Sequence, residues 1–173
     1  QNKEATLNEI LSIDPLSSFA NFEKGHGFEQ VLNYELPNEI CLELAIFYYT
    51  LGLNERAVKV LNSCKATPLI NYWIAYILKD PSYITKAISM SPDFVFPFRS
   101  ETAEVLQWAL TQNKNWQTKY FLGLIYAFKG QTEKAQAYFS DCKMEPDFFA
   151  FYLTRFEFQN GKPGYNGETD LTK

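Results

Sequence analysis

The feature that most constrains the fold of this chain is a 25-residue pattern that occurs twice. Residues 44–68 and 122–146 align without a gap. The aligned pairs include Leu44/Leu122, Ala45/Gly123, Tyr48/Tyr126, Gly52/Gly130, Ala57/Ala135, Leu61/Phe139, Cys64/Cys142 and Pro68/Pro146. Two segments that share apolar, small and turn-forming positions in one order are expected to fold alike.

The shared positions predict a pair of antiparallel helices. In the second copy, Leu122, Gly123 and Tyr126 recur at helical spacing, so they line one face of a first helix. The small Gly123 allows a second helix to approach closely. Gly130 supplies the turn, where a positive φ costs glycine little. Pro146 ends the second helix, because proline cannot continue it.

The order of these residues resembles the tetratricopeptide repeat (TPR), which runs Leu-Gly-x-x-Tyr, then Ala-x-x-x-Phe, then Pro. Residues 122–146 resemble it closely and 44–68 resemble it well. There are two departures: Lys119 and Cys41 occupy the usual Trp position, and the closing Pro comes one residue early. The resemblance implies an all-α fold, an α-α superhelix in which antiparallel helix pairs stack as a TPR-like solenoid.

The rest of the chain is predicted to contain weaker copies of the same unit. Residues 92–99, PDFVFPFR, interrupt the array, because two prolines in eight residues exclude a regular helix. A turn at residues 25–27 is expected to separate two helices, and the polar, Gly/Pro-rich tail 160–173 to be flexible. The predicted units of one TPR-like domain over residues 1–159 span about 3–15, 16–37, 38–68, 69–92, 93–115, 116–146 and 147–159.

Four strings resemble a narrower group, the carboxy-terminal helical region of large Bacteroides-type TPR proteins. They are LELAIFYYTLG (42–52), YWIAYIL (72–78), FVFPFRSE (94–101) and PDFFAFYLTRF (146–156). In that group a β-rich domain of unknown function, likened to sugar-binding folds, precedes the repeats. The resemblance implies that this chain is a middle-to-late part of a longer protein and that the repeats carry no catalytic residue.

Composition and charge exclude several classes of function. The formal net charge is -4 and no run of Lys and Arg is present, which argues against nucleic-acid binding. No stretch approaches the roughly 18 apolar residues that a membrane span needs. The single histidine, His26, lies between two glycines, and the carboxylates are spread along helices. We therefore expect no enzymatic activity, no cofactor and no metal site.

The three cysteines, Cys41, Cys64 and Cys142, are not close to one another in sequence, and none has zinc-site spacing. Each occupies a helix-like apolar pattern, so we expect small buried thiols. Their odd number disfavours a pure disulfide framework and does not fix the compartment; the cytoplasm is slightly favoured over the periplasm. The oligomeric state is not predicted.

The first helices of TPR-like units line a concave groove, so their outward positions are candidate binding residues. Arg99 is a candidate clamp for an anion or a peptide carboxylate; alternatively it stacks on a phenylalanine or pairs with a helix carboxylate. A further alternative is that tight curvature or missing domains bury the groove as ordinary core. The candidates are Tyr49, Tyr72, Tyr76, Arg99, Tyr120, Leu124 and Phe128.

The sequence thus predicts a non-catalytic scaffold that binds a protein, a peptide or another domain of its own longer chain through an aromatic groove. The alternative is a structural or accessory arm of a carbohydrate-binding or carbohydrate-active multidomain protein. In that case Trp73, Trp108 and Trp116 would stack on sugar rings, although their helical spacing favours core packing.

Overall fold

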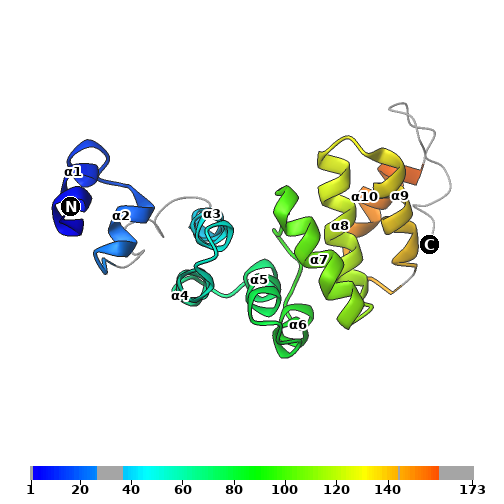
Figure 1. Cartoon of the computed structure of the whole chain (residues 1–173). Coiled ribbons are helices and arrows are strands. Elements are labelled where there is room, and N and C mark those ends of the chain that lie inside the picture. The colour runs from blue at the N-terminus through cyan, green and yellow to red at the C-terminus, as the bar shows by residue number, and fades with distance from the viewer. Residues whose placement is uncertain (1, 27–36, 144, 160–173) are drawn as a thin grey trace. The chain divides into compact units, whose positions relative to one another are not determined.

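The computed structural model describes residues 2–26, 37–143 and 145–159, and within these ranges the chain forms ten helices and no strand (Figure 1). Their bounds are α1 (Lys3–Ile13), α2 (Ser18–Glu23), α3 (Pro37–Thr50), α4 (Asn54–Asn62), α5 (Pro68–Leu78), α6 (Ser82–Ile88), α7 (Ser100–Gln112), α8 (Trp116–Phe128), α9 (Thr132–Asp141) and α10 (Phe149–Gln159). The predicted all-α, TPR-like fold class is confirmed. The helix expected after the turn at 25–27 and the flexible tail 160–173 lie outside the described residues.

The chain divides into two compact units, Gln1–Tyr83 and Ile84–Lys173, and the boundary falls inside α6. Each of them contains one of the two sequence copies. The first contains the α3–α4 hairpin and the second contains the α8–α9 hairpin. The finer division into repeat units stays a prediction.

Several helices begin at side chains that satisfy the free N–H groups of the first turn. Thr67 Oγ1 accepts a hydrogen bond of 3.3 Å from the Ile70 N–H at the start of α5, and Pro68 occupies the first helical position. Asn115 Oδ1 accepts from the Gln117 N–H at 2.8 Å and starts α8 in the same way. Such caps stabilise a helix by about 1 kcal/mol each.

The two sequence copies turn at the same place and in the same way. Gly52 and Gly130 have φ angles of 75° and 69°, in the left-handed region that glycine adopts without strain. In the second copy the Gly130 N–H donates to the Ala127 carbonyl and the Gln131 N–H donates to the Tyr126 carbonyl, both at 2.9 Å. The first copy has the two corresponding bonds at the same length. The prediction of one hairpin used twice is therefore confirmed.

The close approach expected at Gly123 is present. A Cβ atom built on this residue would lie 2.3 Å from the nearest ring atom of Phe139, well inside van der Waals contact. Phe139 belongs to α9 and is fully buried. Only a residue without a side chain therefore lets α8 and α9 pack at this distance.

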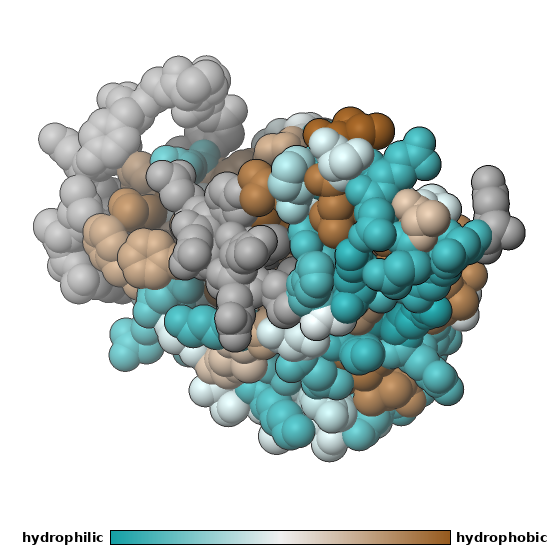
Figure 2. All heavy atoms as spheres, turned by 90° about the vertical axis from the view of Figure 1, so that its left-hand side faces the viewer, coloured by the Kyte–Doolittle hydropathy of each residue, from teal (hydrophilic) through white to brown (hydrophobic). Residues whose placement is uncertain are grey.

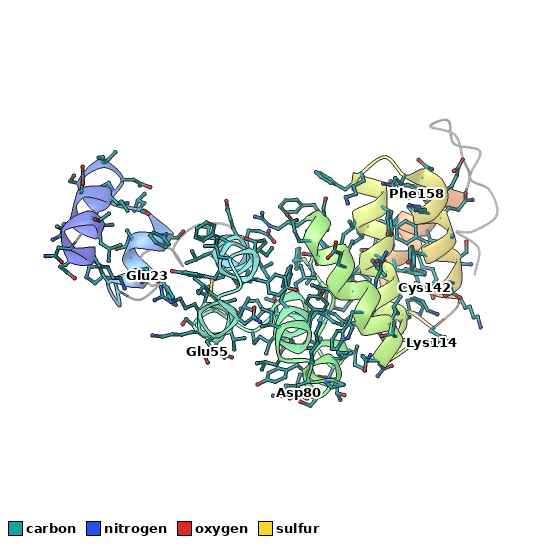
Figure 3. The ribbon with its side chains drawn as sticks, in the orientation of Figure 1. Glu23, Glu55, Asp80, Lys114, Cys142 and Phe158 are labelled. Carbon is teal, nitrogen blue, oxygen red and sulfur yellow. A yellow bond between two sulfur atoms is a disulfide. The ribbon has the colours of Figure 1, made fainter. Side chains whose placement is uncertain are left out.

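Cys41 and Cys64 form a disulfide that joins α3 to the residues following α4, with their Cα atoms 6.5 Å apart (Figure 3). The expectation of three buried thiols is wrong for this pair. The hairpin brings the two cysteines together although they are 23 positions apart in sequence. The third cysteine, Cys142, is buried and free, and burial raises the pKa of its thiol to about 12.

The second hairpin is joined differently at the corresponding positions. Lys119, which aligns with Cys41, places its Nζ 2.9 Å from Asp141 Oδ2 and donates to the Asp141 carbonyl at 3.1 Å. Cys142, which aligns with Cys64, donates its S–H toward the Trp116 carbonyl at 3.4 Å. An ion pair thus replaces the disulfide of the first copy.

In the first unit, a carboxylate joins the two amino-terminal helices to the α3–α4 hairpin. The Glu23 side chain is only 5% exposed; Lys3 Nζ lies 2.6 Å from it, the Tyr48 hydroxyl donates to it at 2.6 Å, and Arg56 pairs with it (Figure 3). Burial raises the pKa of Glu23, but the hydrogen bonds from Lys3 and Tyr48 and the charge of Arg56 outweigh it and leave the pKa below its ordinary value.

Candidate functional site

The candidate residues fall in both compact units. The first unit holds Tyr49, Tyr72 and Tyr76, and the second holds Arg99, Tyr120, Leu124 and Phe128.

In the first unit, α3 and α5 bring two of the three candidates together. The rings of Tyr49 and Tyr76 lie 5.9 Å apart in an edge-to-face arrangement, and both are half-buried. Trp73 contacts both, with ring centroids 5.7 and 6.3 Å away. Lys79 Nζ lies 3.6 Å from the centre of the Tyr76 ring. These contacts pack the two tyrosine rings against neighbours within the unit and leave each ring partly exposed.

Tyr72 is fully buried, so the expectation that it lines a groove is wrong. The reason is the composition of α5, PLINYWIAYIL, which is apolar around nearly its whole circumference. Such a helix is part of a core rather than one wall of a groove.

Tyr120 is also misassigned, because it is only 2% exposed. The rings of Phe121, Phe139, Phe148 and Phe151 surround it at centroid distances of 5.7 to 6.1 Å. Two of these rings come from α10 and the segment before it, which cover the face of α8 that the repeat register assigned to a groove. Burial raises the pKa of the Tyr120 hydroxyl.

Three exposed aromatic side chains of the second unit come from the segment that interrupts the repeats; other exposed ones are Phe128, Phe149 and Tyr152. Phe94 is 92% exposed, Phe96 67% and Phe98 37%; Phe128, at the end of α8, is 72% exposed. The rings of Phe98 and Phe128 lie 5.7 Å apart. We call these four phenylalanines the aromatic surface. Leu124, one helical turn before Phe128, is half-buried.

Arg99 ends this segment and is half-buried. Its guanidinium carbon lies 5.0 Å from the centre of the Phe98 ring. This geometry matches the alternative in which the arginine stacks on a phenylalanine. Its role as an anion clamp stays a prediction.

Sequence reasoning identified residues 92–99 as a break in the array but did not count their phenylalanines as candidates. The signal was present, because Phe94, Phe96 and Phe98 alternate with other residues. Two prolines exclude a regular helix here, so these aromatic side chains are not assigned to a buried helix face. Helical register, which was used to select the candidates, does not apply there.

Phe94 also has an unusual backbone. Its φ is 57°, in the left-handed region, inside a turn in which the Val95 N–H donates to the Pro92 carbonyl at 3.2 Å. Glycine or asparagine is the usual residue at such a position, and another side chain costs about 1–2 kcal/mol. A strained, almost fully exposed aromatic residue is a candidate contact for a partner.

Beside the aromatic surface lies an apolar cavity of about 150 Å³. One wall is the interrupting segment, and the other comes from α8 and the start of α10. The lining residues are Pro92, Asp93, Phe94, Val95, Phe96, Tyr120, Phe148 and Ala150. An apolar group that fills a cavity of this kind gains binding free energy because apolar surface is removed from water.

The described residues contain no cluster of three or more side chains of the metal-ligating types, and none of their helices is long and apolar enough to span a membrane. The face shown in Figure 2 is largely hydrophilic, with separate hydrophobic patches. On that face, exposed hydrophobic area is therefore local rather than continuous.

The hairpins define an all-α, TPR-like fold. A family profile described as Tetratricopeptide repeat matches residues 117–144, a range that contains most of α8 and all of α9. No curated protein and no solved structure matches the chain. Tetratricopeptide repeats generally mediate protein–protein interaction, and helical folds of this type are typically non-catalytic scaffolds. The resemblance to Bacteroides-type proteins stays a prediction.

Proposed function

We propose that this chain is a non-catalytic interaction module that binds a protein or peptide through the aromatic surface of its second unit. The observation that carries the proposal is the exposure of four phenylalanines, Phe94, Phe96, Phe98 and Phe128, beside an apolar cavity. Single exposed apolar residues are common on proteins, but several exposed aromatic residues beside an apolar cavity are typical of interaction sites.

Binding would bury aromatic surface while the side chains lose little conformational entropy. The rings of Phe98 and Phe128 already pack against each other, and Pro97, whose φ is fixed, directly precedes Phe98. A partner therefore meets a surface that is partly ordered before binding, which lowers the entropy lost on association. Each phenylalanine that becomes fully buried contributes about 1.5–3 kcal/mol.

The carbohydrate alternative has less support. Trp73 is 1% exposed, and Trp108 and Trp116 are half-buried, so the indoles expected to stack on sugar rings are largely occupied by the protein itself. A glycan panel titrated by calorimetry tests it directly. Saturable binding of a sugar by the chain would favour the alternative.

The proposal is tested by selecting peptides from a displayed random library on the whole chain and measuring their affinity by fluorescence anisotropy. Phe96→Ala and Phe128→Ala are each expected to weaken the selected peptides by about tenfold or more. Because both side chains are exposed, the thermal midpoints of the two variants should stay close to that of the original chain.

Ile13→Ala is the matched control, since Ile13 is 81% exposed but belongs to the first unit. It should leave affinity unchanged. Selected peptides that bind equally well to the original chain and to both phenylalanine variants would refute the proposed surface.

A further inference from the structure

We infer that the cavity beside the aromatic surface holds one leucine- or phenylalanine-sized side chain of the partner, flanked in the partner by lysine or arginine. This inference rests on the proposed function and names the chemistry that its site recognises.

The size and lining of the cavity indicate which side chain of the partner it holds. A volume of about 150 Å³ matches one apolar side chain rather than a helix or an extended segment. Apolar cavities of about this volume in proteins accept benzene-sized molecules. Tyr120 and Phe148, whose rings lie 5.8 Å apart edge-to-face, contribute to one wall, and Ala150 leaves that wall open. An apolar side chain would complete this aromatic packing.

The charge at the cavity indicates which residues flank the apolar side chain in the partner. Asp93 lines the cavity and Asp147 directly precedes the lining residue Phe148; both are exposed. The basic residue next to the lining Tyr120 is Lys119, which is already paired with Asp141 at 2.9 Å. Asp93 is the one charged residue among those that line the cavity, and a partner with lysine or arginine beside its apolar residue complements it.

Asp93 is held in position by its own segment. Its Oδ2 accepts a hydrogen bond from Ser91 Oγ at 2.6 Å, and its backbone N–H donates to the same hydroxyl at 3.1 Å. A carboxylate that is already fixed beside an apolar cavity loses less conformational entropy when it binds a cation than a mobile carboxylate does. The turn that fixes Asp93 also contains Phe94.

The experiment uses short peptides with blocked termini and the central sequences Lys-Leu-Lys, Lys-Ala-Lys and Glu-Leu-Glu, titrated into the whole chain labelled at alanine methyl groups. The Lys-Leu-Lys peptide should shift the Ala150 methyl signal and bind about tenfold more tightly than either of the others. Ala150→Leu, which fills the cavity, should abolish this binding, whereas Ala150→Ser, which keeps it open, should retain it. Asp93→Asn should weaken binding of the Lys-Leu-Lys peptide by about two- to fivefold.

The outcomes separate the two proposals. If library-selected peptides depend on Phe96 and Phe128 but ignore Ala150→Leu and show no preference for lysine, the cavity inference fails and the proposed function stands. If the Ala150 methyl signal moves with concentration of the chain alone, the occupant is a second copy and the inference also fails. Because the methyl shift is measured on the original chain, the test does not depend on any variant folding.

Discussion

The disulfide between Cys41 and Cys64 gives a stability prediction that can be worked from its loop. It closes a loop of 23 positions, and the chain-entropy relation assigns such a loop about 3.4 kcal/mol of stabilisation through the unfolded state. We therefore expect Cys41→Ala/Cys64→Ala, or reduction of the original chain, to destabilise the α3–α4 hairpin by about 3 kcal/mol. This corresponds to a roughly 150-fold increase in the open population of the hairpin.

Hydrogen exchange read by mass spectrometry reports each hairpin separately, which a single unfolding curve of a two-unit chain does not. With reductant, amides of α3 and α4 should lose protection, while those of α8 and α9, which are joined by the Lys119–Asp141 pair, should keep it. The double variant should show the same loss and no further response to reductant.

Alkylation in denaturant supplies the independent check. Without reductant only Cys142 should be modified, and with reductant all three cysteines should be modified. If all three react without reductant, or if reduction leaves protection of α3 and α4 unchanged, the reasoning is refuted.

Three further predictions concern other features. Gly123→Ala should destabilise the second unit by about 1–3 kcal/mol in denaturant titration, although alanine favours helix by about 1 kcal/mol, because the new methyl group meets Phe139; a stabilised variant would contradict the packing described. Glu23→Gln should cost about 1–2 kcal/mol at neutral pH. The folded pKa of Glu23 is lowered, so the stability that its carboxylate contributes is present above the unfolded pKa near 4.5 and is lost as pH falls through the folded pKa. The Glu23→Gln variant should therefore lose less stability in acid than the original chain, as measured by circular dichroism from pH 7 to 2. Phe94→Gly should leave the thermal midpoint equal or higher, since glycine adopts φ of 57° freely, yet weaken selected peptides by about tenfold; an unchanged affinity would remove Phe94 from the surface.

The hairpins were predictable from sequence because their determinants are local. Gly52 and Gly130 mark the turns, and small residues at Ala45 and Gly123 mark the helix crossing. These signals depend on a few neighbouring residues and on steric limits that hold in any context. The same locality explains why residues 92–99 were recognised as a break.

The candidate site was predicted less well, because exposure depends on what covers a helix face. Register placed Tyr120 on an outward face of α8, but Phe148 and Phe151, from a later segment of the chain, cover it. Tyr72 was treated as one wall of a groove, whereas the apolar composition of α5 already indicated a core helix. Phe128, at the end of α8, is exposed, and its role as a binding residue stays a prediction.

The disulfide was missed for a related reason. Two cysteines 23 positions apart become neighbours only when the register between two packed helices is fixed, and aligning the copies drew attention to Cys64 and Cys142 instead. The partner of Cys64 aligns with a lysine in the other copy, so the repeat pattern concealed the pair.

That a cystine occupies one copy and an ion pair the other has a practical consequence for any preparation of this protein. Material made in a host whose cytosol keeps thiols reduced would contain molecules of identical sequence that differ only in the hydrogens on two sulfur atoms. The two forms would differ in the rigidity of one hairpin, so an affinity measured on such a sample would be an average over both. Converting the whole sample to the oxidised or to the reduced form before each titration gives each form its own value.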